Sequence, residues 1–139
     1  MKPLSRIFAL IFITALASSA CGKLQRDNSG PNISDVATSD KVVVISDCLS
    51  TSVTITAKVT DASNVKNVLL WYRVGADQPF FSSTMKLQNG IYAANVKGSE
   101  LQGHGYGPME FYITAEDEAG NSSKSSVDHS IQFLPCVNN

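Results

Sequence analysis

Residues 109–121, M-E-F-Y-I-T-A-E-D-E-A-G-N, carry the strand pattern from which we predict the fold of this sequence. Two sets of side chains alternate over its first eight residues: Met109, Phe111, Ile113 and Ala115 with Glu110, Tyr112, Thr114 and Glu116. This period of two is typical of a strand with one face in a core and the other towards water. Asp117, Gly120 and Asn121 then predict a turn. We therefore expect a central strand of a β-sandwich, followed by a hairpin that leads to the last strand.

Six further segments have strand character, and none after residue 20 has a helical period. They are 33–45, 53–59, 68–74, 80–87, 92–96 and 125–134. Asn89-Gly90 is a strong hairpin signal between two of them. Short strands separated by turns predict an all-β fold, an antiparallel β-sandwich of about seven strands.

The third of these segments, 68–74, is apolar on both faces. We expect its even-numbered residues in the core and Trp71 and Arg73 on the outward face. In the last segment we expect four alternating residues to point inward: Val127, His129, Ile131 and Phe133.

The first twenty residues have the features of a secretory signal peptide. Lys2 and Arg6 precede the apolar run 7–16, and small residues lead to Cys21. A membrane-spanning helix would need about twenty apolar residues, so the run is too short to span. The domain division that follows is a signal peptide at 1–20, a polar tether at 21–31 and a folded domain at 32–139.

The position of Cys21 resembles the lipobox of bacterial lipoproteins, with Ser19 and Ala20 before the cysteine. The resemblance implies acylation of Cys21, and Gly22 after it implies sorting to the outer membrane. Ser18 departs from the pattern, since the family favours Leu there. The alternative is ordinary cleavage after Ala20, with Cys21 as a free thiol.

The other two cysteines, Cys48 and Cys136, fall just before the second predicted strand and just after the last. A seven-strand count puts both at the same pole of the sandwich, and disulfides persist in an oxidising compartment. We expect a Cys48–Cys136 disulfide, with two buried free thiols as the alternative. Closing so long a loop stabilises a domain by roughly 4–5 kcal/mol in the chain-entropy model.

The charge of the chain argues against nucleic acid as a partner. The sequence has 11 Lys and Arg and 12 Asp and Glu, and two of the basic residues, Lys2 and Arg6, lie in the leader. The remaining chain is mildly acidic and lacks basic clusters, which also argues against direct attraction to anionic lipid.

A family resemblance covers roughly residues 33–133. V-x-x-V-x-L-x-Y-R at 65–73, G-x-Y at 90–92 and F-Y-I-x-A-x-D-x-A-G-N at 111–121 resemble the immunoglobulin-like and fibronectin-III-like modules of bacterial surface proteins. The resemblance implies an immunoglobulin-like sandwich. Such modules usually serve as spacers, adhesion units or accessory parts of larger enzymes, and fold does not fix function.

The candidate binding patch consists of Trp71, Arg73 and Tyr112. Trp71 and Tyr112 should lie on neighbouring strands, with Arg73 and Glu110 beside them, as a flat patch for a glycan or a protein. Two structural alternatives are that Trp71 is a core tryptophan in the reversed register, or that it covers the sheet under a loop.

Other polar residues give weaker signals. His104, in G-H-G-Y-G, is a candidate for a recognition loop, while Tyr106 is a candidate for the tyrosine corner of such sandwiches. The run 116–118, E-D-E, offers oxygen ligands of the kind calcium takes, but it lacks the spacing of a calcium loop, and we predict no metal and no cofactor.

No catalytic motif is visible in the sequence, and we expect a protein that is not an enzyme. The leading expectation is a non-catalytic binding or envelope-assembly module, secreted across the inner membrane and held by its lipid anchor. Its partner would be a protein or glycan of the periplasm or cell surface. The runner-up is a structural accessory subunit of an envelope complex, and a third possibility is a secreted inhibitor or ligand-binding domain.

Overall fold

The computed structural model describes residues 26–45 and 51–135. This part of the chain forms ten strands and one short 3-10 helix, η1. In chain order they are β1 (Asn32–Thr38), β2 (Val42–Ile45), β3 (Ser52–Thr60), β4 (Val65–Val74), β5 (Phe81–Thr84), β6 (Lys86–Gln88), β7 (Ile91–Lys97), η1 (Gly98–Leu101), β8 (Gly107–Asp117), β9 (Ser122–Lys124) and β10 (Asp128–Pro135).

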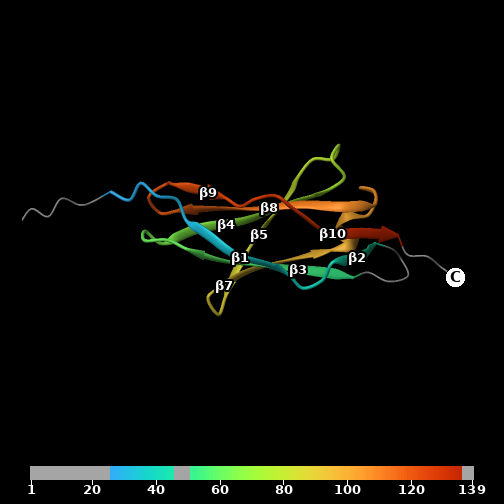
Figure 1. Ribbon diagram of the computed structural model, residues 1–139, viewed down its shortest axis with the longest axis horizontal. Coiled ribbons are helices and arrows are strands. Elements are labelled where there is room, and N and C mark those ends of the chain that lie inside the picture. Colours follow the sequence, from blue (N-terminus) through green and yellow to red (C-terminus); the bar gives the residue numbers. More distant parts are fainter. Residues whose placement is uncertain (1–25, 46–50, 136–139) are drawn as a thin grey trace, which may run out of the picture.

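The strands form two sheets that pack face to face, as Figure 1 shows. The first sheet has the order β1-β3-β7-β6 and the second β2-β10-β8-β4-β5, with β9 paired to one end of β8. All pairs are antiparallel except β2 with β10, which are parallel. The prediction of an all-β fold is confirmed, and the two sheets have the arrangement of a β-sandwich.

Strand β8 lies at the centre of the second sheet, between β10 and β4. Its odd-numbered residues from Met109 to Asp117 are buried, and the even-numbered ones between them are half-buried. The turn after it closes through a hydrogen bond from the Gly120 amide to the Asp117 carbonyl. The strand and the turn predicted from 109–121 are therefore confirmed.

The core lies between the sheets and consists of inward side chains from both. From the first sheet it takes alternate residues of β3 and β7, such as Val53, Ile55 and Val96. From the second it takes Phe111 and Ile113 of β8, with residues of β4 and β10. On β4 the inward residues are those expected, Val68, Leu70, Tyr72 and Val74. Burial of such side chains contributes roughly 1.5–3 kcal/mol each.

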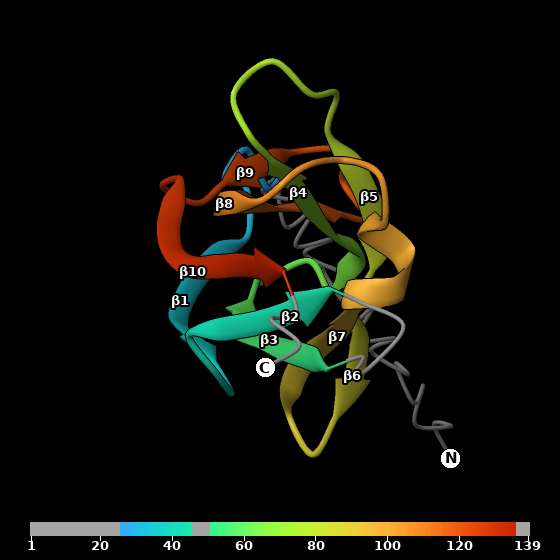
Figure 2. The same cartoon turned by 90° about the vertical axis from the view of Figure 1, so that its right-hand side faces the viewer.

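Two of the predicted strands each divide between the sheets. The segment 33–45 gives β1 in the first sheet and β2 in the second, with the crossing at 39–41. The segment 80–87 gives β5 in the second sheet and β6 in the first, and Met85 is buried at that crossing. Figure 2 shows β2 beside β10 and β6 beside β7. A periodicity over one segment cannot reveal that its two halves join different sheets.

The predicted orientation of the last strand is wrong at its start. Ile131 and Phe133 are buried as expected, but His129 has 57% of its side chain exposed and Val127 42%. The register of β10 against β8 shifts between Asp128 and Ile131. Such a bulge changes which face the preceding side chains occupy.

The hairpin predicted at Asn89-Gly90 joins β6 and β7. Both residues have positive φ angles, 50° and 82°. A two-residue turn of this type needs that conformation at both positions, which asparagine and glycine adopt most readily. The hairpin prediction is confirmed.

Residues 26–31, the described end of the predicted tether, contact the sandwich. The Asp27 carbonyl accepts a hydrogen bond from Asn121 Nδ2 at 3.2 Å. Gly30 lies so close to β9 that a Cβ there would be 2.6 Å from Ser123 Oγ. None of the described residues belongs to a helix with the length and hydropathy needed to cross a membrane.

Candidate functional site

The outward face of the second sheet brings together the predicted patch residues. Trp71 and Tyr112 are direct register partners on β4 and β8, and Arg73 pairs in the same way with Glu110. The Trp71 and Tyr112 rings are 6.1 Å apart between centroids, with 12° between their planes. Rings that are nearly parallel at this separation are offset sideways from each other.

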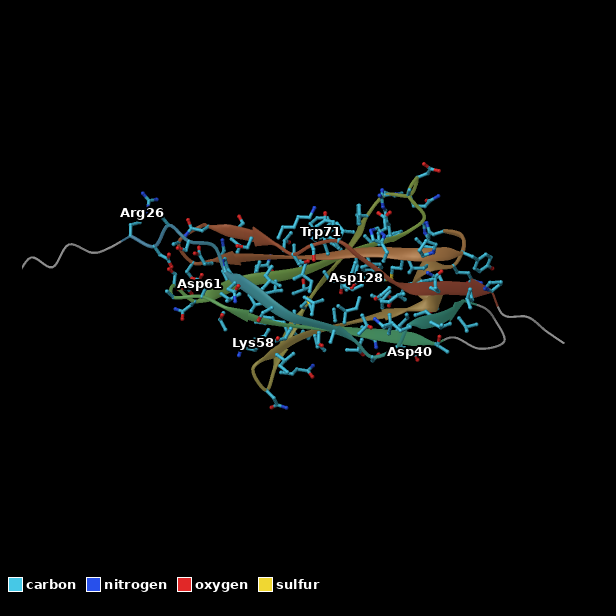
Figure 3. All side chains as sticks on the ribbon, in the orientation of Figure 1. Arg26, Asp40, Lys58, Asp61, Trp71 and Asp128 are labelled. Atoms are coloured by element: carbon cyan, nitrogen blue, oxygen red, sulfur yellow. The ribbon has the colours of Figure 1, made fainter. Side chains whose placement is uncertain are left out.

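Trp71 is not a core residue. Its neighbours Leu70 and Tyr72 point into the core, whereas Trp71 is half-buried on the opposite face. Figure 3 shows it on the outer side of the second sheet, away from Lys58 on the first. The alternative of a reversed register is therefore wrong, and the outward orientation of Trp71 is confirmed.

Hydrogen bonds and ion pairs hold the patch in place. Trp71 Nε1 donates to Thr114 Oγ1 at 2.9 Å. Arg73 Nε donates to Glu110 Oε2 at 2.7 Å, and both side chains are mostly buried, with 23% and 18% exposed. A partly buried arginine–carboxylate pair restricts both side chains, which pre-organises the surface around them.

Two neighbours of the patch were not expected from the sequence. Phe80, in the loop between β4 and β5, packs its edge against Tyr112 at 5.1 Å between ring centroids and lies 4.5 Å under the Arg73 guanidinium. Lys124 of β9 places its Nζ 3.7 Å from the Tyr112 ring centroid. A local pattern could not reveal either contact, because the contacts depend on how the loop and β9 fold over the sheet.

A hollow of about 260 Å³ lies on the same face beside the patch. Its lining includes the side chains of Asn67 and Leu69 from β4, Thr114 and Glu116 from β8, and Ser122 of β9. Thr114 therefore links the hollow to the Trp71 indole through its hydrogen bond. The binding role of Trp71, Arg73 and Tyr112 stays a prediction.

The carboxylates at 116–118 point in three different directions. Glu116 forms an ion pair with Lys66 at 2.6 Å, and this bond raises the pKa of Lys66. Asp117 is fully buried, and Glu118 accepts a hydrogen bond from Asn64 Nδ2 at 3.4 Å. Within the described residues they do not form one ligand set.

A different set of carboxylates meets at the end of the sandwich. Oxygens of Asp27, Asp61 and Asp117 lie within 4.8 Å of one another. Oxygens of this kind are the ligands that calcium takes, so these are the described residues that could hold a cation. Sequence reasoning missed the set because its members are far apart in the chain.

Protein donors already satisfy this carboxylate cluster. Asp117 accepts from the Asn121 backbone amide at 2.7 Å and from Asn121 Nδ2 at 2.8 Å. Asp27 accepts from the Ser63 hydroxyl, which is the main cause of a lowered Asp27 pKa, and Asp61 accepts from the Ser63 amide at 2.7 Å. These bonds fasten the segment 26–31 to two turns of the domain, which is a structural role.

His104 and Tyr106, the two residues singled out in the segment between β7 and β8, have no contacts that indicate a binding site within the described residues. His104 packs its ring against Phe81, with 4.8 Å between centroids and 77° between planes. Tyr106 is 59% exposed, and its hydroxyl makes no hydrogen bond to any described residue. The interpretation of Tyr106 as a tyrosine corner is wrong, because that motif pins its hydroxyl to the backbone.

All three cysteines lie outside the described residues. The predicted acylation of Cys21 and the predicted Cys48–Cys136 disulfide therefore stay predictions. No protein-family model matches the sequence, and comparison with curated proteins finds no match either.

Proposed function

We propose that this protein is a non-catalytic binding module of a bacterial envelope, which recognises a protein or a glycan through the outward face of its second sheet. The observation that carries the proposal is the row formed by Trp71, Tyr112 and Phe80, three half-buried rings outside the core. Aromatic side chains supply large contact area at low entropic cost and are enriched where proteins bind partners. Their positions are fixed by Arg73 and Thr114.

The strand order supports an immunoglobulin-like classification. Constant-type immunoglobulin domains have the sheets A-B-E-D and C-F-G. The order β1-β3-β7-β6 corresponds to the first, and β4-β8-β10 to the second. Strand β5 stands where variable-type domains add a strand to that sheet. In such domains the loops and the C-F-G face are surfaces available for recognition.

The proposal includes secretion with the signal peptide 1–20, acylation of Cys21 and an outer-membrane position facing the periplasm or the cell surface. The lipobox-like sequence before Cys21 supports it. A Cys48–Cys136 disulfide belongs to the same proposal. Its support from the described residues is that Ile45, three residues before Cys48, pairs in register with Pro135, one residue before Cys136.

The test is sedimentation of the chain with isolated bacterial envelopes. Chain 21–139 with Cys21→Ser lacks both the predicted signal peptide and the acylation site, so its binding does not come from an apolar leader or a lipid. We expect this variant to sediment with envelopes. The additional change Trp71→Ala should raise its apparent dissociation constant about tenfold, which corresponds to about 1.4 kcal/mol of binding free energy, a common cost of losing an aromatic anchor.

The matched control is Lys58→Ala, an exposed residue of the first sheet on the opposite side of the molecule (Figure 3). It should leave sedimentation unchanged. Equal binding by the Trp71→Ala and Lys58→Ala chains would show that the aromatic face is not the binding surface.

A further inference from the structure

We propose that the ligand of this face is a neutral glycan chain, with one sugar unit in the hollow beside Trp71 and the next unit against the exposed part of the Trp71 ring. This inference rests on the proposed function and narrows its partner to one chemical class. It follows from the size of the hollow, the groups that line it, the charges around it and the shape of its rim.

The size of the hollow fits one small unit of a longer ligand. Its volume is about 260 Å³, and it lies open on the face of the sheet. Pockets that enclose a whole drug-sized molecule measure roughly 300–1,000 Å³. A chain of repeating units can occupy this hollow with one unit and gain further contacts from neighbouring units.

The lining of the hollow suits a sugar with hydroxyl or amide groups. Asn67 is exposed, and its side-chain amide has no hydrogen-bond partner among residues 26–45 and 51–135, so it offers two donors and an acceptor. Glu116 adds an acceptor held by Lys66, and Ser122 adds a hydroxyl. Leu69 supplies apolar surface between them.

Within the aromatic row, Trp71 is the ring that suits the apolar face of a sugar, since Lys124 covers the Tyr112 ring and Arg73 covers the Phe80 ring. The negative face of an aromatic ring attracts groups with partial positive charge, and sugar C–H groups carry such charge. Trp71 is half-buried and offset from Tyr112, which leaves part of its indole ring exposed. Thr114 connects the ring and the hollow, because it lines the hollow and accepts the indole N–H.

The charges on this face favour a neutral ligand over a charged one. The two carboxylates that β8 contributes are each paired: Glu110 with Arg73 at 2.5 Å and Glu116 with Lys66 at 2.6 Å. The Lys124 ammonium lies over the Tyr112 ring and forms no ion pair with a described residue, so one uncompensated positive charge remains, and salt screens a single exposed charge. Electrostatic recognition of a charged partner depends on complementary potentials, and paired charges provide little net potential.

The rim of the face favours a narrow ligand over a broad one. Figure 2 shows the loop between β4 and β5 arching away from the second sheet, and this loop includes Phe80 beside the aromatic row. The loop therefore limits how closely a broad, flat partner can approach the aromatic row at that end of β4. A single glycan chain can lie next to the loop and still contact Trp71 and Asn67.

The test uses the fluorescence of Trp71, the only tryptophan of the chain. Chain 21–139 with Cys21→Ser is titrated with three neutral hexasaccharides, namely cellohexaose, chitohexaose and maltohexaose, and with hexagalacturonate as the charged comparison. We expect a saturable change in emission with at least one neutral hexasaccharide, and none with hexagalacturonate at the same concentrations.

Two variants locate the site. Asn67→Ala should raise the dissociation constant of that hexasaccharide about tenfold, because the variant loses the hydrogen bonds of the Asn67 amide to the ligand. A tenfold change corresponds to about 1.4 kcal/mol of binding free energy. Lys58→Ala, on the other sheet, should leave it unchanged. Asn67 is exposed, so its replacement should not disturb folding, and an unchanged melting temperature checks this.

Three results would overturn the inference: no response to any neutral hexasaccharide at millimolar concentration, tighter binding of hexagalacturonate, or binding that is equal in Asn67→Ala. Envelope sedimentation separates this failure from that of the proposed function. If sedimentation depends on Trp71 while no hexasaccharide binds, the face has a different partner and only the glycan inference fails.

Discussion

At the scale of the residue, the two neighbours Trp71 and Tyr72 have opposite environments. Tyr72 is 6% exposed and packs in the core, while Trp71 is half-buried and its indole N–H bonds to Thr114 on the outer face. The sequence predicted this correctly from the apolar residues at alternate positions. It could not predict Phe80 and Lys124 as neighbours of Tyr112, because those contacts depend on the path of a loop and a short strand.

The first prediction compares two aromatic residues of the second sheet. Trp71→Ala should lower the free energy of unfolding by about 1–2 kcal/mol, because part of its surface already contacts water. Phe111→Ala should lower it by about 3–5 kcal/mol, because Phe111 is fully buried. Urea denaturation of both variants measures the difference, and equal losses would contradict the outward position of Trp71.

The second prediction concerns Asp117, a fully buried carboxylate. Asp117→Ala removes the acceptor of two hydrogen bonds from Asn121, at 2.7 and 2.8 Å. Bonds to charged groups contribute roughly 1.5–3 kcal/mol each, so we expect a loss of about 3 kcal/mol in the free energy of unfolding. Glu118→Ala, an exposed neighbour, is the control and should change stability by less than about 0.5 kcal/mol.

At the scale of the element, local periodicity predicted strand faces well and strand partners poorly. The faces of β3, β4 and β8 follow from alternation within each segment. The division of 33–45 and of 80–87 between two sheets, and the bulge that exposes His129, depend on pairing with distant strands. The Asp27–Asp61–Asp117 cluster is a similar case, since three separate segments meet there.

The third prediction concerns the contact between η1 and β2. A Cβ on Gly98 would lie 2.6 Å from the Val44 carbonyl oxygen and 3.3 Å from that of Thr51. Gly98→Ala should therefore lower the free energy of unfolding by about 1–3 kcal/mol, the usual cost of overpacking. The neighbouring change Ser99→Ala, at an exposed position, should have little effect. Thermal unfolding of both variants measures this, and a Gly98→Ala chain of native stability would contradict the close packing.

At the scale of the whole molecule, the segment 26–31 and two turns meet at one end of the sandwich, where Figure 3 labels Arg26 and Asp61. The Ser63 hydroxyl holds the pKa of Asp27 below its usual 3.8. The folded state thus favours the charged form of the Asp27 carboxyl. Its contribution to stability is present above the unfolded pKa and is lost as the pH falls through the lower, folded value.

The fourth prediction follows from this shift. The melting temperature should fall between roughly pH 5 and pH 2, and part of that fall should depend on Asp27. Ser63→Ala removes the main cause of the lowered pKa, so its melting temperature should depend less steeply on pH in this range. If the melting temperatures of wild type and Ser63→Ala fell equally steeply with pH over the acid range, the role of this contact would be contradicted.

Acrylamide quenching of Trp71 fluorescence shows whether the aromatic face is the binding surface. The chain with Cys21→Ser is measured alone and with isolated envelopes to which it has bound. Trp71 is the only tryptophan of the chain, so once the emission of envelopes measured without the chain is subtracted, the quenching reports on this face. We predict that bound envelopes protect Trp71, with a quenching constant at least about twofold lower than for the free chain. Unchanged quenching in a chain that is fully envelope-bound would show that it binds through another surface.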